Sequence, residues 1–272
     1  HLHSPVHFLN CAVSLRFPGT PRRAFSGGHS DAPVRMKSLC TSPAGAYEPA
    51  PPASPRHFFC FTVALWLAIG FFVVPVLPAQ AAWENGWIEN LQLAILLGGG
   101  AVAAWRAIVS WRQGARADVV ALAVCLTPVW MLLAARELSW GAALLQPLAI
   151  GADGPEYSSS VLWYKPAVAP VAVALLVAAG SLFAWFRVER VVWSVLRAGH
   201  FPWAELGLGV AAALLSTYGE GHLLGMEVSP HWGNNAAVLE EWAEVAAYMA
   251  LVLAQWQVLG WAARSAARSR RC

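Results

Sequence analysis

The stretch Val238–Ala263, VLEEWAEVAAYMALVLAQWQVLGWAA, decides the fold because it is a long apolar run that starts with carboxylates. Its length is enough for a helix that crosses a hydrocarbon core of ~30 Å. At about 100° per residue, a polar stripe runs down this helix. The stripe consists of Glu241, Glu244, Tyr248 and Gln255. Carboxylates near a membrane core are costly, so we expect the stripe to face other helices or a ligand and not lipid.

The composition of the whole chain indicates the same class of protein. Of its 272 residues, 58% are hydrophobic and only 12% are charged, whereas a soluble domain has roughly 25% charged residues. The formal net charge of +3 is too small to suggest a nucleic-acid partner. The spacing of the five cysteines fits neither a zinc motif nor a disulfide framework. We therefore expect the lipid bilayer to be the first partner of this chain.

The first part of the chain does not read as a folded domain. Residues 1–57 are rich in Pro, Ser, Gly and Arg and show no sustained apolar period, so we expect a disordered tail. Met36, followed by Lys37, is a plausible true start. A start at Met36 would make residues 1–35 a translated upstream segment or a clipped fragment, and the sequence does not decide whether they belong to the mature protein.

Six apolar segments follow, each close to the roughly 20 residues of a membrane-spanning helix. They are Phe58–Leu77, Gly86–Trp105, Val119–Ala135, Pro166–Phe186, Trp203–His222 and Val238–Ala263. A signal peptide is the alternative for the first segment, which ends near Ala79-Gln80-Ala81, but the run is longer than a usual signal core. The segments predict an all-α, polytopic membrane helix bundle with six transmembrane helices over residues 58–263. A basic cytoplasmic tail is expected over residues 264–272.

The distribution of charge predicts the orientation. With a cytoplasmic N-terminus, all but Arg136 and Lys165 of the 18 Lys and Arg residues fall on the cytoplasmic side, as the positive-inside rule requires. Both termini are then cytoplasmic. Ten of the 15 acidic residues fall on or near the opposite, extracytoplasmic face: Glu84, Glu89, Glu137, Asp153, Glu156, Glu220, Glu227, Glu240, Glu241 and Glu244. Insertion does not need this imbalance, because acidic residues contribute little to topology.

Polar groups at four helix ends on the extracytoplasmic face form a candidate pocket for a ligand or ion. The candidates are Glu89, Gln92, Arg136, Glu137, Glu220, His222, Glu241, Glu244 and Tyr248. Glu89 and Gln92 are three residues apart and share a helix face. Arg136, almost the only cation on this side, is the natural ion-pair partner for Glu89, Glu241 or Glu244. The alternative is that its side chain extends to the membrane interface, as a single arginine at a helix end usually does. Glu240 lies off the polar stripe, and we expect it to reach water.

Two local patterns complete the prediction. Glu220, His222 and Glu244 are candidate ligands of a divalent metal, although no H-E-x-x-H motif is present. The alternative for His222 is a hydrogen-bonded side chain in a loop. Gly98-Gly99-Gly100 is expected to let its helix approach a neighbour closely.

Three short patterns carry a resemblance: E-x-G-x-x-E-x-x-Q at Glu84–Gln92, R-E-x-x-W at Arg136–Trp140 and E-E-x-x-E at Glu240–Glu244. In these positions the chain resembles uncharacterised bacterial multi-pass inner-membrane proteins. The resemblance implies a location in the bacterial inner membrane and no particular activity.

Three functions fit the pattern. The first is an integral inner-membrane protein whose acidic pocket binds or transports a proton, a cation or a small polar solute. The second is a membrane-embedded, metal-dependent hydrolase or lipid-modifying enzyme, with carboxylates as ligands or general acids and Arg136 holding an anionic headgroup. The third is a structural or interaction protein in which the charges only lock helices together. The sequence favours the first and the third over the enzyme.

Overall fold

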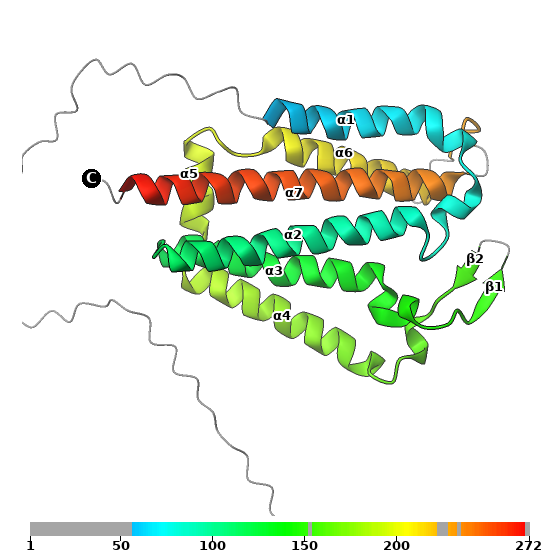
Figure 1. Ribbon diagram of the computed structural model, residues 1–272, viewed down its shortest axis with the longest axis horizontal. Coiled ribbons are helices and arrows are strands. Elements are labelled where there is room, and N and C mark those ends of the chain that lie inside the picture. Colours follow the sequence, from blue (N-terminus) through cyan, green and yellow to red (C-terminus); the bar gives the residue numbers. More distant parts are fainter. Residues whose placement is uncertain (1–55, 152–153, 222–227, 233–234, 270–272) are drawn as a thin grey trace, which may run out of the picture. The chain divides into compact units, whose positions relative to one another are not determined.

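The computed structural model describes residues 56–269 with the exception of 152–153, 222–227 and 233–234. The expected tail up to residue 55 lies outside this part, and so does the candidate ligand His222. The described residues are mostly helical (Figure 1). The all-α prediction is therefore confirmed for this part of the chain.

The helices follow the predicted apolar segments, with one short helix added. They are α1 (Arg56–Val73), α2 (Trp87–Arg112), α3 (Ala117–Glu137), α4 (Lys165–Trp185), α5 (Glu189–Arg197), α6 (Trp203–Gly219) and α7 (Ala236–Ser269). Short 3-10 helices occupy the connections: η1 (Val74–Val76), η2 (Ala79–Ala82), η3 (Ser139–Leu144) and η4 (Ser159–Val161). A small antiparallel hairpin, β1 (Ala149–Gly151) with β2 (Gly154–Glu156), pairs Ala149 with Glu156.

Helix α7 is the central element of the bundle. It packs against α1, α2, α3, α5 and α6, while α4 packs chiefly on α3. The long helices run alongside one another, and α5 crosses them at one end (Figure 1). We call that end, with Arg112, Arg116, Arg190 and Arg264, the arginine-rich end, and the other, where α2 and α7 begin and α3 and α6 finish, the acidic end.

Five helical segments are long and apolar enough to cross a membrane, which is compatible with an integral membrane protein. In the described part of the chain they are Phe59–Val76, Ala79–Arg112, Ala117–Glu137, Lys165–Trp185 and Ala236–Ala266. The remaining predicted span corresponds to α6, which has 17 residues and is the shortest of the six. Helix α7 continues to Ser269, through most of the stretch that was expected to be a tail.

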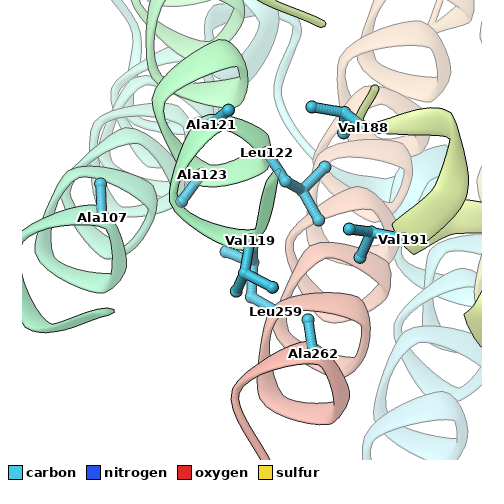
Figure 2. Close-up of a cluster of buried hydrophobic side chains, with 9 residues drawn as sticks. All are labelled: Ala107, Val119, Ala121, Leu122, Ala123, Val188, Val191, Leu259 and Ala262. Carbon is cyan, nitrogen blue, oxygen red and sulfur yellow. The ribbon is translucent and has the colours of Figure 1, made fainter. Parts of the chain in front are cut away.

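Helix α5 was not anticipated from the apolar segments, because it is amphipathic and short. Val191 and Val195, four residues apart, are buried, while Arg190, Trp193 and Arg197 are exposed. This spacing places the two valines on one helix face. Val191 is part of a hydrophobic cluster that α5 shares with α2, α3 and α7 (Figure 2). The cluster consists of Ala107, Val119, Ala121, Leu122, Ala123, Val188, Val191, Leu259 and Ala262.

A pair of tryptophans joins α1 to α7. The rings of Trp66 and Trp242 stack with centroids 4.1 Å apart and an interplanar angle of 10°. Trp66 Nε1 donates to the carbonyl of Trp242 at 3.0 Å, and Trp242 Nε1 donates to the carbonyl of Trp66 at 2.9 Å. Gly70 makes room for this pair, since a Cβ there would lie 2.5 Å from the Trp242 ring.

The glycines of α2 set the distance between α2 and α3. A Cβ at Gly99 would lie 2.9 Å from the Trp130 ring, and one at Gly100 would lie 3.3 Å from Trp130 Cβ. Gly98 faces open space. The expected close approach is confirmed for Gly99 and Gly100, and Gly98 takes no part in it.

Replacing Gly99 with alanine is expected to destabilise the protein by about 1–3 kcal/mol, because the rigid Trp130 ring has to move. Gly98→Ala is the matched control on the same helix and is expected to leave stability unchanged or raised. Denaturant unfolding in detergent measures both. Equal stability of the two variants would show that α2 and α3 do not pack through Gly99.

Candidate functional site

The candidate residues come from four helix ends that meet at the acidic end of the bundle. Glu89 and Gln92 lie in the first turns of α2, and Glu137 is the last residue of α3. Glu220 follows α6 directly, and Glu241 lies in the first turns of α7. The antiparallel order of these helices therefore brings the predicted residues together, apart from His222, which lies outside the described part.

Gln92 and Glu241 form the most deeply buried contact of the group. The Gln92 side chain is 0% exposed, and its Nε2 donates to Glu241 Oε2 at 2.7 Å and to the Glu241 carbonyl at 3.1 Å. These two bonds fix the orientation of the amide, since both acceptors need the nitrogen. The Gln92 Oε1 atom is buried and has no hydrogen-bond partner among the described residues. The site therefore offers a fixed and unused oxygen next to a carboxylate.

Two further carboxylates are held by hydroxyl groups. Tyr248, which is buried, donates from its hydroxyl to Glu137 Oε1 at 2.8 Å, so α7 is tied to the end of α3. Ser216 of α6 donates to Glu244 Oε1 at 3.4 Å. The predicted polar stripe of α7 thus faces other helices, as expected. Ser216 was not predicted, because a single serine in an apolar segment gives no signal in the sequence.

Glu240, which was expected to reach water, is partly exposed. Its side chain also lies close to that of Glu220, just after α6. The close packing of α6 on α7 explains this proximity, because Gly219 lets the two backbones approach near Glu240. Two carboxyl groups this close repel one another when both are ionised, so the pair adds to the excess of negative charge in the site.

The predicted ion pair of Arg136 was wrong. Arg136 interacts electrostatically with Glu240, Glu244 and Tyr248, but it forms no direct ion pair within the described part of the chain. The side chain of α3 that contacts α7 is the neighbouring Glu137, through Tyr248. Arg136 therefore acts on the carboxylates from a distance and does not neutralise a single one of them.

The group as a whole has a large excess of acidic side chains. Pairwise electrostatic interactions link six carboxylates of the four helix ends to one another, and two of them, Glu240 and Glu244, also interact with Arg136. The six are Glu89, Glu137, Glu220, Glu240, Glu241 and Glu244. Partly buried like charges at this density are stable only when protons or bound cations compensate them.

The outermost acids also have local structural roles. Glu89 accepts a hydrogen bond from the backbone N–H of Asn85, just before α2 begins. Such a bond satisfies a free donor at a helix start. Glu84 accepts from the backbone N–H of Tyr157 at 2.7 Å, which ties the start of α2 to the segment after β2. Glu89 therefore caps the start of α2 and also interacts electrostatically with Glu137.

The predicted divalent metal site finds no support in the part of the chain that the structure describes. No three His, Cys, Asp or Glu side chains there are arranged to hold a metal ion. Of the proposed ligands, Glu220 lies close to Glu240, and Glu244 bonds to Ser216. The role of His222 stays a prediction. His231 contacts α1: its ring stacks on Phe71, and its Nε2 lies 3.2 Å from the Phe71 carbonyl.

A second buried carboxylate lies toward the arginine-rich end. Glu205 of α6 is 1% exposed and accepts hydrogen bonds from Cys60 Sγ at 3.2 Å and from Gln257 Nε2. Between the two ends, Gln255 accepts from Trp130 Nε1 and donates to the Gly99 carbonyl at 2.9 Å. In the sequence, Glu205 is notable as a carboxylate inside an apolar segment. Its partners come from α1 and α7 and cannot be identified from the sequence.

Comparisons with protein-family models, with curated proteins and with solved structures found no match. The resemblance to bacterial inner-membrane proteins therefore stays an expectation from three short patterns. A function for this chain is therefore inferred from the geometry of the site.

Replacing Gln92 with methionine removes the amide that holds Glu241 and leaves a buried carboxylate without this donor. We expect a loss of about 1–3 kcal/mol in the free energy of unfolding. Gln146→Met, the same change at an exposed position, is the control and is expected to have little effect. Unfolding curves in detergent at neutral pH measure the difference. A Gln92 variant as stable as the Gln146 variant would contradict the assigned contact.

Proposed function

We propose that this chain is a multi-pass membrane protein whose acidic end binds a proton or a cation from the extracytoplasmic side. The observation that carries the proposal is the linked group of six carboxylates, with Arg136 nearby but without a direct ion pair to it in the described part of the chain. Ionisable groups in membrane segments commonly mark ion or proton pathways, because their desolvation is costly unless function retains them.

The chemistry of the site favours a proton or a monovalent cation over a transition metal. Its free acceptors are carboxylate oxygens and the Oε1 atom of Gln92, which are hard oxygen ligands. The Glu220–Glu240 pair brings two carboxyl groups close together, and this arrangement favours the uptake of a proton. Proton exchange at this pair is therefore the simplest reaction for the proposed function.

We further propose that the bound proton or cation is transported, and the polar residues along α7 support this. Tyr248 and Gln255 continue the stripe below the carboxylates, and Gln257 reaches Glu205 on the other side of the helix. Buried polar groups thus occur at several depths between the two ends. A relay over these positions requires rearrangement at Gln255, whose amide groups are occupied by Trp130 and Gly99.

The proposal includes six spans with both termini in the cytoplasm of a bacterial cell and the protein in its inner membrane. Helix α6 supports the sixth span, because it packs along α7 and its 17 residues lie at the lower limit for crossing. The charge rule supports the orientation. Seven arginines gather at one end: Arg106, Arg112, Arg116, Arg187, Arg190, Arg197 and Arg264.

Cysteine labelling tests the sixth span. In a background without native cysteines, His200→Cys and Pro230→Cys place thiols at exposed positions in the connections before and after α6. We expect a membrane-impermeant maleimide to label position 230 in intact cells and position 200 only after permeabilisation. Labelling of both positions under the same condition would contradict a membrane-crossing α6.

Proteoliposomes test the function. With a pH-sensitive dye inside and an imposed membrane potential, the wild-type chain is expected to show inward proton flux. Glu244→Gln is expected to reduce the flux roughly tenfold or more, because a charged hydrogen-bonding partner contributes about 1.5–3 kcal/mol. Glu156→Gln, an exposed change at the same end, is the matched control.

Three outcomes separate the alternatives. Flux of Na⁺ or K⁺ instead of protons would retain the site and change its ligand. Absence of flux and of cation binding, with Glu241→Gln and Glu244→Gln altering only stability, would favour a structural protein. Stoichiometric zinc, manganese or iron in the purified protein would favour the metal-dependent enzyme.

A further inference from the structure

The arginine-rich end contains two adjoining polar hollows beside α5. The larger has a volume of about 250 Å³, and its polar lining consists of Arg116, Arg190, Ser194 and Ser265. The smaller, of about 110 Å³, is lined by His200, Trp261, Arg264 and Ser265. Trp261 and Ser265 line both. We refer to the two together as the basic hollow.

Two of the positive charges in the basic hollow are not neutralised by the protein. Arg116 forms an ion pair with the buried carboxylate of Asp118. Arg190 and Arg264 form no ion pair and donate no hydrogen bond within the described part of the chain. The exposed Glu189 at the start of α5 is the nearest acid in sequence, and it does not line either hollow.

The remaining polar groups of the hollow fit an anion. Ser265 is partly buried, and its hydroxyl has no hydrogen-bond partner among the described residues. Guanidinium groups and a hydroxyl are donors that match the several acceptor oxygens of a phosphate group. The volume of the larger hollow is sufficient for such a group, which is not much bigger than a few water molecules at ~30 Å³ each.

The position of the hollow favours a phosphate that belongs to a lipid. Helix α5 crosses the ends of the membrane-competent helices with its valines buried and Trp193 exposed, as in a helix at the membrane surface (Figure 1). On its other flank lies an apolar groove of about 270 Å³, where Leu126, Val192, Leu251 and Val258 form part of the wall. The basic hollow thus lies where headgroups are expected, next to a surface that suits acyl chains.

We propose that the basic hollow is a binding site for the phosphate of an anionic phospholipid, with Arg190 and Arg264 as its charged contacts and Ser265 as a hydrogen-bond donor. Basic pockets between membrane helices on the cytoplasmic side are a known mode of headgroup recognition. This site is at the opposite end from the carboxylate group and does not depend on its function.

Native mass spectrometry of the full chain tests the site. The purified protein is mixed in detergent with phosphatidylglycerol or phosphatidylcholine, and the fraction that retains one lipid is measured. The wild type is expected to prefer phosphatidylglycerol. The double variant Arg190→Gln, Arg264→Gln is expected to lose about 30-fold in this preference, since each arginine near an anionic headgroup contributes roughly a factor of five.

The matched control is Arg112→Gln, Arg197→Gln. It removes the same charge from the same end, but neither residue lines the hollow. The preference for phosphatidylglycerol is expected to survive in this control. A smaller loss of about three- to fivefold is expected for Ser265→Ala, as for the loss of one ordinary hydrogen bond.

Other outcomes would overturn the proposal. An equal loss in the two double variants would show a diffuse charge effect in place of a site. No lipid preference in the wild type would exclude lipid recognition. If millimolar inorganic phosphate displaced phosphatidylglycerol from the wild type and bound on its own, the ligand would be a free anion and the assignment to lipid would be wrong.

Discussion

The structure depends on how the carboxylates at the start of α7 are accommodated in a bundle with few cations to oppose them. Three neighbouring helices contribute hydrogen bonds to the polar stripe of α7: Gln92 from α2 bonds to Glu241, Ser216 from α6 to Glu244, and Glu137 from α3 to Tyr248. The central position of α7 follows from this requirement, because an acidic helix start in a lipid environment needs polar neighbours on several sides. The partners are mostly neutral donors. They orient the carboxylates without removing the excess of negative charge, and this separates the site from an ordinary buried ion pair, where one cation compensates one anion.

The two ends of the same bundle therefore have opposite chemistry. The acidic end combines several carboxylates with amide and hydroxyl donors, and Arg136 forms no direct ion pair within the described residues. The arginine-rich end has guanidinium groups in excess over acids, and only Arg116 has a carboxylate partner in the described residues. The two ends of the bundle therefore present charges of opposite sign. The buried Glu205 is an exception, since it lies toward the arginine-rich end and is held by Cys60 and Gln257.

The helices and the polar stripe of α7 were predictable because they depend on local properties, namely the length of apolar runs and the spacing of residues on one helix. Gly99 was predictable for the same reason. Which side chains on different helices contact one another was not predictable. Glu240 lies off the stripe in a helical projection, yet α6 covers that side of α7 and places Glu220 against it. Arg136 was the natural cation by composition, but the orientation of the last turn of α3 places Glu137 toward α7 instead. Helix α5 was not predicted because its nine residues are amphipathic and too few to form a membrane-spanning segment.

The stacked tryptophans Trp66 and Trp242 have a consequence for the mechanics of the bundle. Each indole donates to the main-chain carbonyl of the other residue, so the two hydrogen bonds fix the axial register of α1 against α7. Sliding of α1 by even a single residue, about 1.5 Å, would break both bonds in surroundings that offer no water to replace them. Trp242 directly follows Glu241 in α7, so the carboxylates at the start of this helix are held in a fixed position relative to α1 by the same two bonds.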